Sequence, residues 1–192
     1  FFFVDHCILP LMTSLKRFVA DDLFSFNTVN LDKLTETYGP PFYFEYLAHW
    51  PEYFTIARSP AGYAMGYIMG KVEGPGEDWH GHVTAVSTGA EFRRLGLGNK
   101  FMNTLEEVSE HVHKGYFVDL FVRASNAVAV GMYKKMGYVV YRTVLGYYSA
   151  GKNDPAEDAY DMRKPLSKDK ERKKSSVIPL KEPITPDELE WA

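Results

Sequence analysis

Short apolar runs bounded by turn residues recur along the chain, and runs of this kind predict β-strands. Two of them, 52–58 and 64–72, alternate apolar and polar positions and are joined by SPAGY, which predicts a β-hairpin. The other predicted strands are 14–19, 82–88, 115–122, 138–144 and 158–164. A segment rich in Gly and Pro, EGPGEDWHG, predicts a loop after the hairpin, so strands and loops alternate along most of the chain.

A helical period replaces the strand period in two segments between these strands. From Gly96 to His113 the apolar positions fall on one stripe, which predicts an amphipathic helix. The stripe consists of Leu97, Phe101, Leu105, Val108 and Val112. Residues 125–137 predict a second helix, with Ser125 or Asn126 as its N-cap and Gly137 as its end. Helices that alternate with strands in this way predict an α/β domain.

The segment before the hairpin is less regular. Residues 21–31 predict a helix that begins at an acidic cap. Residues 34–42 predict a loop, because Pro40 and Pro41 are incompatible with a helix interior. A short aromatic helix is expected at 42–50, where the next proline ends it.

The aromatic helix carries more apolar residues than one narrow core stripe accommodates. These residues are Phe42, Phe44, Tyr46, Leu47 and Trp50. Two interpretations stay open: the helix is deeply inserted in the core, or a partner protein covers an exposed apolar part of it.

The chain length of 192 residues suits one α/β domain with a full core and is short for two. We expect this domain at 12–165, preceded by an N-terminal extension at 1–11 and followed by a charged, proline-containing tail at 166–192. The extension lacks the basic start and the cleavage site of a signal peptide. The tail has little to bury, which favours a segment that is disordered alone or laid onto a partner.

Charge and cysteine content narrow the class of protein. The net charge of -3 and the pI near 6.1 provide no basic field, so no direct nucleic-acid binding is expected. A transmembrane helix is not predicted, because the chain lacks a run of about 20 apolar residues. Cys7 is the single cysteine, which excludes an internal disulfide and a CxxC site and favours a reducing compartment. We therefore expect a cytoplasmic protein without a membrane partner.

The sequence RRLGLG at 93–98 lies between a predicted strand and a predicted helix. Gly96 and Gly98 allow backbone amides to crowd together, and the helix that follows adds its unpaired N–H groups and its positive dipole end. Arg93 and Arg94 add charge at the same place, which favours a polyphosphate ligand. The alternative is a tight turn with two surface arginines. A Walker A loop and a dinucleotide loop are excluded, because their lysine and their third glycine are absent.

This loop resembles the Arg/Gln-x-x-Gly-x-Gly/Ala pyrophosphate loop of the GNAT superfamily of N-acetyltransferases. SNAVAVGMYKKMGY resembles a later helix of the same family, with Asn126, Tyr133 and Gly137 in their customary order. The resemblance implies the GNAT fold. This is an α/β fold with a mixed, mostly antiparallel central sheet, helices on both faces and a V-shaped opening for acetyl-CoA.

Further stretches resemble, more narrowly, the catalytic subunits of N-terminal acetyltransferase B (NatB). They are LTETYGPPFYFEYLAHWPEYF, WHGHVTAV, FVDLFVRASN, YRTVLGYYSA and EDAYDMRK, and the resemblance spans roughly 12–181. It implies acetyl transfer from acetyl-CoA to the α-amine of nascent proteins that begin with Met-Asp, Met-Glu, Met-Asn or Met-Gln, by direct attack in a ternary complex. It also implies a large auxiliary subunit of helical repeats that links the enzyme to the ribosome.

The resemblance assigns residues to the acetyl-CoA side of the site. The pyrophosphate would contact Arg93, Arg94, Gly96, Leu97 and Gly98, and the pantetheine arm would pair with the main chain of Val86 and Thr88. Asn126 would contact the arm, and Tyr133 would protonate the leaving thiolate. At Gly98 related chains often carry alanine, which is also small.

The resemblance also assigns substrate-binding residues, namely Glu36, Tyr38, His82, Tyr147 and Tyr148. His82 would contact the second side chain of the substrate, and tyrosine hydroxyls suit both an acid and an amide there. Candidates for moving the proton of the amine are Glu36, His82 and Tyr148, which the sequence does not rank.

Each of these residues has a structural alternative. Glu36 would be solvated, and the tyrosines would pack in the core. His80 and His82 have the spacing of a metal pair, but no third ligand is recognisable, so no metal is expected. Two other functions remain: a GNAT enzyme that acetylates lysine or small amines, and a non-catalytic subunit that binds acetyl-CoA.

Overall fold

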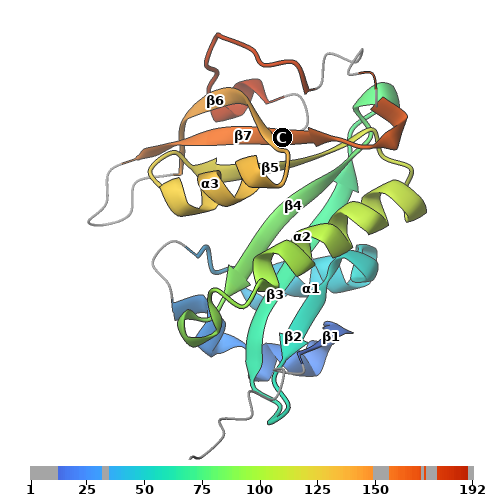
Figure 1. Cartoon of the computed structure of the whole chain (residues 1–192), viewed down its shortest axis with the longest axis vertical. Coiled ribbons are helices and arrows are strands. Elements are labelled where there is room, and N and C mark those ends of the chain that lie inside the picture. Colours follow the sequence, from blue (N-terminus) through green and yellow to red (C-terminus); the bar gives the residue numbers. More distant parts are fainter. Residues whose placement is uncertain (1–12, 32–34, 149–155, 170, 172–176, 190–192) are drawn as a thin grey trace, which may run out of the picture.

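The computed structural model describes residues 13–31, 35–148, 156–169, 171 and 177–189, so the N-terminal extension and its cysteine lie outside it. Its centre is a seven-stranded sheet in the order β1-β2-β3-β4-β5-β7-β6 (Figure 1). The strands are β1 (Ser14–Arg17), β2 (Thr55–Arg58), β3 (Ala64–Glu73), β4 (His80–Thr88), β5 (Phe117–Arg123), β6 (Val139–Tyr148) and β7 (Glu157–Pro165). Every strand predicted from the sequence is present, which confirms the α/β class.

The sheet consists of two antiparallel halves. Strands β1 to β4 pair antiparallel in one half, and β5, β7 and β6 pair antiparallel in the other. The two halves meet through β4 and β5, which are parallel and pair only at Gly81–Val118, His82–Asp119 and Val83–Leu120. Beyond Val83 these two strands are not paired. The predicted mixed sheet with a V-shaped opening is therefore confirmed.

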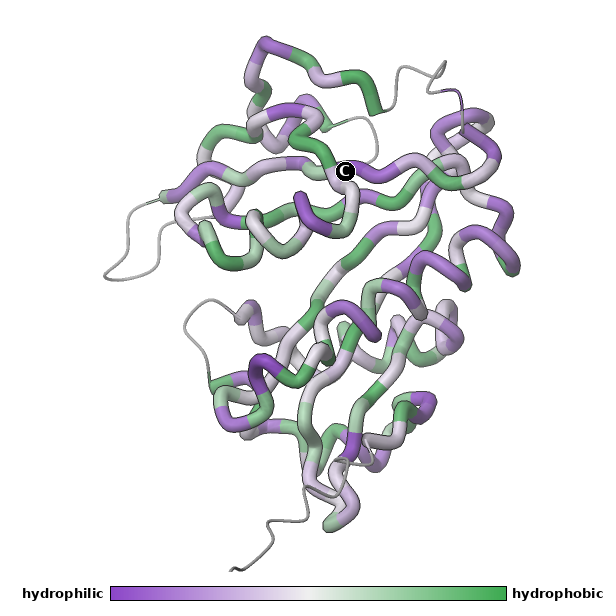
Figure 2. The backbone as a smooth tube through the Cα atoms, viewed as in Figure 1, coloured by the Kyte–Doolittle hydropathy of each residue, from purple (hydrophilic) through white to green (hydrophobic). Residues whose placement is uncertain are grey.

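Helices cover both faces of the sheet, as predicted. Figure 1 shows α2 (Leu97–Glu107) and α3 (Ala127–Lys135) on the near face and α1 (Pro40–His49) behind. Along α2 hydrophilic and hydrophobic positions alternate, because one side packs on the sheet and the other faces solvent (Figure 2). None of the helices in the described part of the chain is long and apolar enough to cross a membrane.

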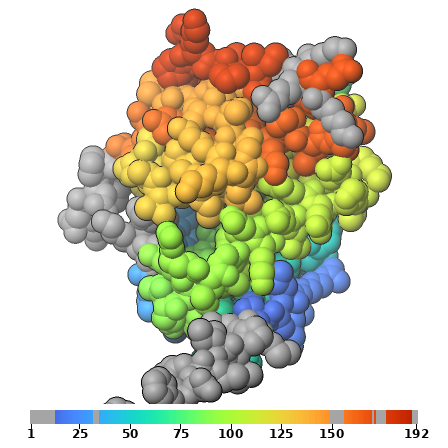
Figure 3. Space-filling view, viewed as in Figure 1, coloured from blue at the N-terminus to red at the C-terminus, as the bar shows by residue number. Residues whose placement is uncertain are grey.

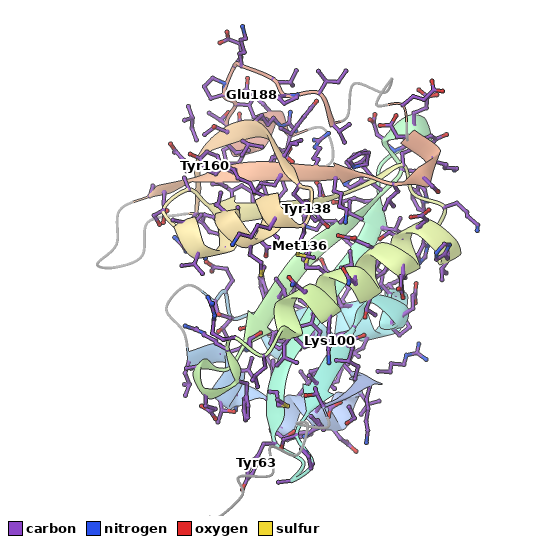
Figure 4. The ribbon with its side chains drawn as sticks, in the orientation of Figure 1. Tyr63, Lys100, Met136, Tyr138, Tyr160 and Glu188 are labelled. Atoms are coloured by element: carbon purple, nitrogen blue, oxygen red, sulfur yellow. The ribbon has the colours of Figure 1, made fainter. Side chains whose placement is uncertain are left out.

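Two polar contacts connect α2 to the half of the sheet that consists of β5, β7 and β6. The hydroxyl of Tyr138, labelled in Figure 4, donates a 2.9 Å hydrogen bond to Glu106 of α2. The ammonium group of Lys164 on β7 lies 2.5 Å from the same carboxylate. Charge-assisted hydrogen bonds of this kind are stronger than neutral ones, so they help to hold together two halves that share few backbone hydrogen bonds.

Two local predictions before the hairpin are wrong. Residues 21–31 form two short 3₁₀ turns, Ala20–Phe24 and Asn27–Leu31, rather than one helix. Helix α1 begins at Pro40, so both prolines lie inside its first turn. A proline is compatible with that position, because the first N–H groups of a helix have no intrahelical acceptor.

The aromatic helix α1 is partly inserted in the core and partly exposed, so each of the two interpretations from the sequence describes one side of it. Tyr43 and Tyr46 are buried in an apolar cluster beneath the helix, together with Phe18, Phe26, Phe54 and Tyr67. Phe44 on the outer side is 49% exposed. The helix is therefore firmly packed on one side and leaves an apolar side chain in solvent on the other.

The C-terminal segment differs from its prediction. Val177 is buried, and Ile184 lies against β6, where its carbonyl accepts from Leu145 N–H at 2.8 Å and its N–H donates to Thr143 at 3.1 Å. β6 itself extends to Tyr148, beyond the predicted end at 144. The described part of the tail therefore packs on the edge of the chain's own sheet, because β6 is an edge strand with backbone groups left to pair.

Glycines on β3 allow α2 to lie close to the sheet. A Cβ at Gly70 would be 2.6 Å from the carbonyl oxygen of His82 and 2.7 Å from Leu105 of α2. Both distances are below van der Waals contact, and the carbonyl belongs to the backbone, which cannot move aside easily. The close packing of α2 on β3 therefore requires that residue 70 has no side chain.

We predict that Gly70→Ala lowers the free energy of unfolding by roughly 1–3 kcal/mol, because it overpacks the contact between α2 and β3. Gly131→Ala in α3 is the matched control, since a Cβ there meets nothing within 4 Å and should stabilise the helix by about 0.5–1 kcal/mol. Urea denaturation followed by circular dichroism measures both. Equal stability of the two variants would contradict the packing argument.

Candidate active site

Two cavities meet where β4 and β5 separate. A cavity of about 130 Å³ is lined by residues from both strands and from α3, and one of about 300 Å³ is lined by both strands and by the end of β6. The residues that line both are Glu36, Val83, Thr84, Phe121, Arg123 and Tyr148. Figure 3 shows a hollow between the yellow surface of α3 and the green surface near the start of α2. A cavity of about 540 Å³ between α2 and the end of β7 contains none of the predicted site residues.

The smaller cavity brings together Val86, Asn126 and Tyr133. Asn126 is the N-cap of α3, and its Oδ1 accepts a 3.1 Å hydrogen bond from Ala129 N–H. This bond leaves the amide NH₂ group of Asn126 to donate into the cavity that it lines. The residue therefore caps the helix and also lines the cavity with an amide group.

The Gly-rich loop has the geometry of an anion site at the start of α2. Arg94 has a φ of 66° and Gly96 a φ of 78°, two left-handed residues close together directly before the helix. Backbone turned in this way directs successive N–H groups to one side, where they bind anions. A Cβ at Gly98 would lie 3.1 Å from the sulfur of Met132, so this position has little room for a side chain.

The other residues of this region differ in whether their side chain or only their backbone is available to an anion. The side chains of Arg93 and Arg94 are exposed. The side chain of Leu97 is 2% exposed and packs in the core, so only its backbone N–H is suited to an anion. Thr88 ends β4 and pairs with Gly66 of β3.

Tyr133 lies on α3 at the smaller cavity and is buried. Burial raises the pKa of its hydroxyl above the ordinary value of 10.0. Within the described residues this hydroxyl makes no hydrogen bond. It is therefore a protonated donor with its proton available to a ligand in the cavity.

The larger cavity contains every substrate-binding residue predicted from the sequence: Glu36, Tyr38, His82, Tyr147 and Tyr148. They come from the loop before α1, from β4 and from the end of β6, so only the fold brings them together. The ring of Tyr147 stacks on Phe121 at 4.6 Å, and the hydroxyl of Tyr148 donates to the Phe121 carbonyl at 3.2 Å.

The tyrosines of this cavity are hydrogen-bond donors. Burial, with a smaller contribution from the Asp119 carboxylate, raises the pKa of Tyr147 to about 12. Burial also raises the pKa values of Tyr38 and Tyr148. All three are protonated at neutral pH, so none of them is available as a base in its anionic form.

Arg123 was not singled out by the sequence, yet it connects the elements around the larger cavity. Its guanidinium contacts Glu36 at 2.6 Å and Glu157 at 3.1 Å and lies 4.1 Å from the ring centre of Tyr148. These partners belong to the loop before α1, to β7 and to β6. An arginine at the end of a buried strand was the available signal, because such a residue needs partners.

Asp119 is the second residue that the sequence did not single out. It is fully buried, and its Oδ1 lies 2.8 Å from Nδ1 of His82 and 3.4 Å from Nε2 of His80. Burial alone would raise the pKa of this carboxyl, but the two histidines outweigh it and hold the pKa well below its ordinary value. The available signal was a charge inside the apolar run FVDLFV.

The histidine pair does have a third potential metal ligand, which corrects the sequence interpretation. Glu73 lies opposite His80 in the register of β3 and β4, and one donor atom from each of Glu73, His80 and His82 lies within 4.8 Å of the others. However, Glu73 also pairs with Lys71, and Nδ1 of His82 is engaged by Asp119. These contacts favour a hydrogen-bonded ion-pair network.

The comparison with protein families agrees with this geometry. The acetyltransferase (GNAT) family model matches residues 20–138. The chain therefore belongs to the GNAT family of acetyltransferases.

Relatives define its place within the family. The NatB complex catalytic subunit NAA20 of Arabidopsis thaliana is 59% identical over 180 residues, covering 94% of this chain and 99% of that protein. Chaetomium thermophilum Naa20, solved in complex with a bisubstrate analogue, is 40% identical with a TM-score of 0.84 and coverages of 91% and 97%. A NatB complex bound to CoA and MES matches at 43% identity and a TM-score of 0.71, covering 80% and 99%. The chain is a NatB-type catalytic subunit, an N-α-acetyltransferase.

We predict that Asn126→Ala lowers the free energy of unfolding by about 1 kcal/mol, because α3 loses its N-cap. Asn126→Ser is the control, since serine caps helices as well as asparagine does and its side chain has no amide donor. Both variants should bind acetyl-CoA more weakly than the wild type. Urea denaturation and calorimetry measure the two effects, and equal unfolding free energies of the Ala and Ser variants would contradict the capping function.

Proposed function

We propose that this enzyme acetylates the α-amine of proteins that begin with Met-Asp, Met-Glu, Met-Asn or Met-Gln. The observation that carries the proposal is the meeting of two cavities at the divided β4–β5 edge, one suited to acetyl-CoA and one to a peptide N-terminus. The shared lining of the two cavities supports direct attack of the amine in a ternary complex, since both substrates would reach the same opening.

Acetyl-CoA supplies an acetyl group activated as a thioester. The loop at 93–98 would hold its pyrophosphate through backbone N–H groups and the two arginines. The unpaired side of β4 from Val86 to Thr88 would receive the pantetheine arm, together with the Asn126 amide. The left-handed residues of the loop and the start of α2 are suited to the pyrophosphate, and the unpaired edge of β4 is suited to the pantetheine arm.

Proton movements are assigned from the state of each side chain. Tyr133 keeps its proton and would donate it to the leaving thiolate. Tyr148 also keeps its proton, and Glu36 is paired with Arg123, so neither has the properties of a strong base. An α-amine has a pKa of about 7.7–8.0, so part of it is neutral near pH 7 and needs only weak assistance.

The second residue of the substrate would be selected by hydrogen-bond donors. Tyr147 carries a protonated hydroxyl, and His82 lies beside it in the same cavity. Tyr148 is also protonated, but its hydroxyl donates to the Phe121 carbonyl and would have to exchange that bond for one to the substrate. Carboxylate and amide side chains both present an oxygen that accepts such bonds. This shared feature accounts for acceptance of Asp, Glu, Asn and Gln and for rejection of apolar side chains, which would leave the donors unpaired.

We also propose a large auxiliary subunit of helical repeats as the partner, ribosome binding through that subunit and a cytoplasmic location. Solved NatB complexes among the similar structures support the assembly of this chain with a partner, and the other points stay predictions. Exposed apolar residues on the α1 side of the sheet are suited to such a contact: Phe24 is 86% exposed, Leu31 82% and Phe44 49%.

We predict selective acetylation of Met-Asp and Met-Asn peptides by the enzyme purified with its partner. Transfer from labelled acetyl-CoA is measured on peptides that begin Met-Asp, Met-Asn, Met-Leu and Ser-Glu and on a lysine peptide with a blocked N-terminus. Labelling of the blocked peptide would replace the proposed substrate by lysine. No labelling of the Met-Asp and Met-Asn peptides, with intact acetyl-CoA binding, would contradict the proposed substrate preference.

We predict that Tyr133→Phe lowers kcat about 100-fold with little change in acetyl-CoA affinity, because only the proton donor is removed. Tyr138→Phe is the matched control, since its hydroxyl bonds Glu106 away from both cavities; it should lower stability and leave kcat unchanged. Steady-state kinetics and calorimetry make the comparison. A Tyr133→Phe enzyme with wild-type kcat would exclude this tyrosine as the acid.

A further inference from the structure

The end of β6 is irregular, and it carries two tyrosines of the larger cavity. β6 pairs with β7 at Val144–Ala159, and the next pair is Tyr148–Glu157, so β6 contains extra residues between them. Gly146 within this stretch has left-handed backbone, with a φ of 60°. Extra residues of this kind change the direction of nearby side chains, and they are frequent beside active sites.

This irregular stretch decides where Tyr147 and Tyr148 point. Consecutive residues of a regular strand point to opposite faces of the sheet, yet both tyrosines line the larger cavity. The ring of Tyr147 stacks on Phe121, and the hydroxyl of Tyr148 donates to the carbonyl of the same residue. The positions of both rings therefore depend on the backbone directly before them.

The C-terminal segment 177–189 pairs with this part of β6 from the edge that β7 leaves free, since β6 is the last strand of the sheet. Leu145 N–H donates to the carbonyl of Ile184 at 2.8 Å, and Ile184 N–H donates to the carbonyl of Thr143 at 3.1 Å. Figure 1 shows the segment in red next to β6. Ile184 is therefore the backbone partner of the residue that lies two positions before the first tyrosine.

We propose that Ile184 is a positioning residue for Tyr147 and Tyr148: its two backbone hydrogen bonds hold the end of β6 in the form that presents both tyrosines to a peptide N-terminus. This inference rests on the proposed function, because it assumes that a peptide N-terminus occupies the larger cavity. Ile184 contacts no substrate itself and acts through the two tyrosines.

Conformational entropy gives the reason. A strand end with few hydrogen bonds opens locally at a low cost in free energy. Peptide binding would then have to order both the backbone and the two rings, and this entropic cost weakens the binding of the peptide. Acetyl-CoA would be held by the loop at 93–98 and by β4, so its affinity should not depend on Ile184.

The segment is fixed on both sides of Ile184. Before it, Leu180 N–H donates to the carbonyl of Tyr141 on β6 at 2.6 Å. After it, the N–H and the hydroxyl of Thr185 both donate to the carboxylate of Glu188, which Figure 4 labels, at 2.8 and 2.9 Å. These contacts hold Ile184 against β6 before any peptide binds.

Two other functions of the segment are distinguished from positioning. An autoinhibitory segment would occupy the site, but none of the described residues 177–189 lines either cavity. A segment that only stabilises the fold would lower the free energy of unfolding when it is disturbed, without a selective effect on the peptide. A separation of KM from kcat and from acetyl-CoA affinity therefore identifies positioning.

The test is Ile184→Pro, which removes the N–H donor to Thr143 and keeps the carbonyl that accepts from Leu145. We expect KM for a Met-Asp peptide to rise roughly threefold to tenfold, the effect of one net hydrogen bond, with kcat and acetyl-CoA affinity unchanged. Lys181→Pro is the matched control and should leave KM unchanged, because Lys181 is exposed and its N–H makes no backbone hydrogen bond within the described residues. An unchanged KM in a folded Ile184→Pro enzyme would overturn the proposal.

Two further measurements separate the outcomes. In a background with Tyr147→Phe and Tyr148→Phe, Ile184→Pro should have little additional effect on KM, and an additive effect would show that Ile184 does not act through the tyrosines. Should Ile184→Pro fail to fold, hydrogen exchange of the wild type decides: a Met-Asp peptide should raise the protection of the Leu145 and Ile184 amides, and unchanged protection would overturn the proposal. A wild-type enzyme without preference for Met-Asp and Met-Asn over Met-Leu would instead overturn the proposed function.

Discussion

The short parallel pairing of β4 and β5 is the constraint on which the rest of the molecule depends. Three residue pairs join the strands, and beyond Val83 the backbone groups of β4 and β5 do not pair with one another. Unpaired backbone groups inside a protein require partners, and a ligand with amide and carbonyl groups can provide them. The opening is therefore at once a weakness of the sheet and the place where two substrates can meet.

The two halves are held together by side chains around this opening. Glu106 joins α2 to Tyr138 and Lys164 on one side, and Gly98 lies against Met132 on another. Such contacts fix the angle between the halves without closing the opening. The same principle applies on the peptide side, where Arg123 connects the loop before α1 with β6 and β7.

Local patterns predicted much of the fold, and their failures have physical causes. The strands followed from apolar runs, and the α3 cap was predicted at Ser125 or Asn126, of which the structure shows Asn126. Pro40 was misjudged because a proline stops a helix interior but not its first turn. The tail was misjudged because its contact with β6 depends on an edge strand distant in sequence, which no local pattern reveals.

The sequence by itself determined the class of the domain and predicted the turn at 93–98 as a candidate anion site, because glycine spacing, arginines and helix periodicity are local properties. Only the tertiary structure decided which side chains share a cavity. Asp119 and His82 are far apart in sequence and become neighbours through strand register, and Arg123 finds Glu36 across the opening. Contacts between distant segments arise from packing of the whole chain, so the residues that tune the site were visible only once the sheet was assembled.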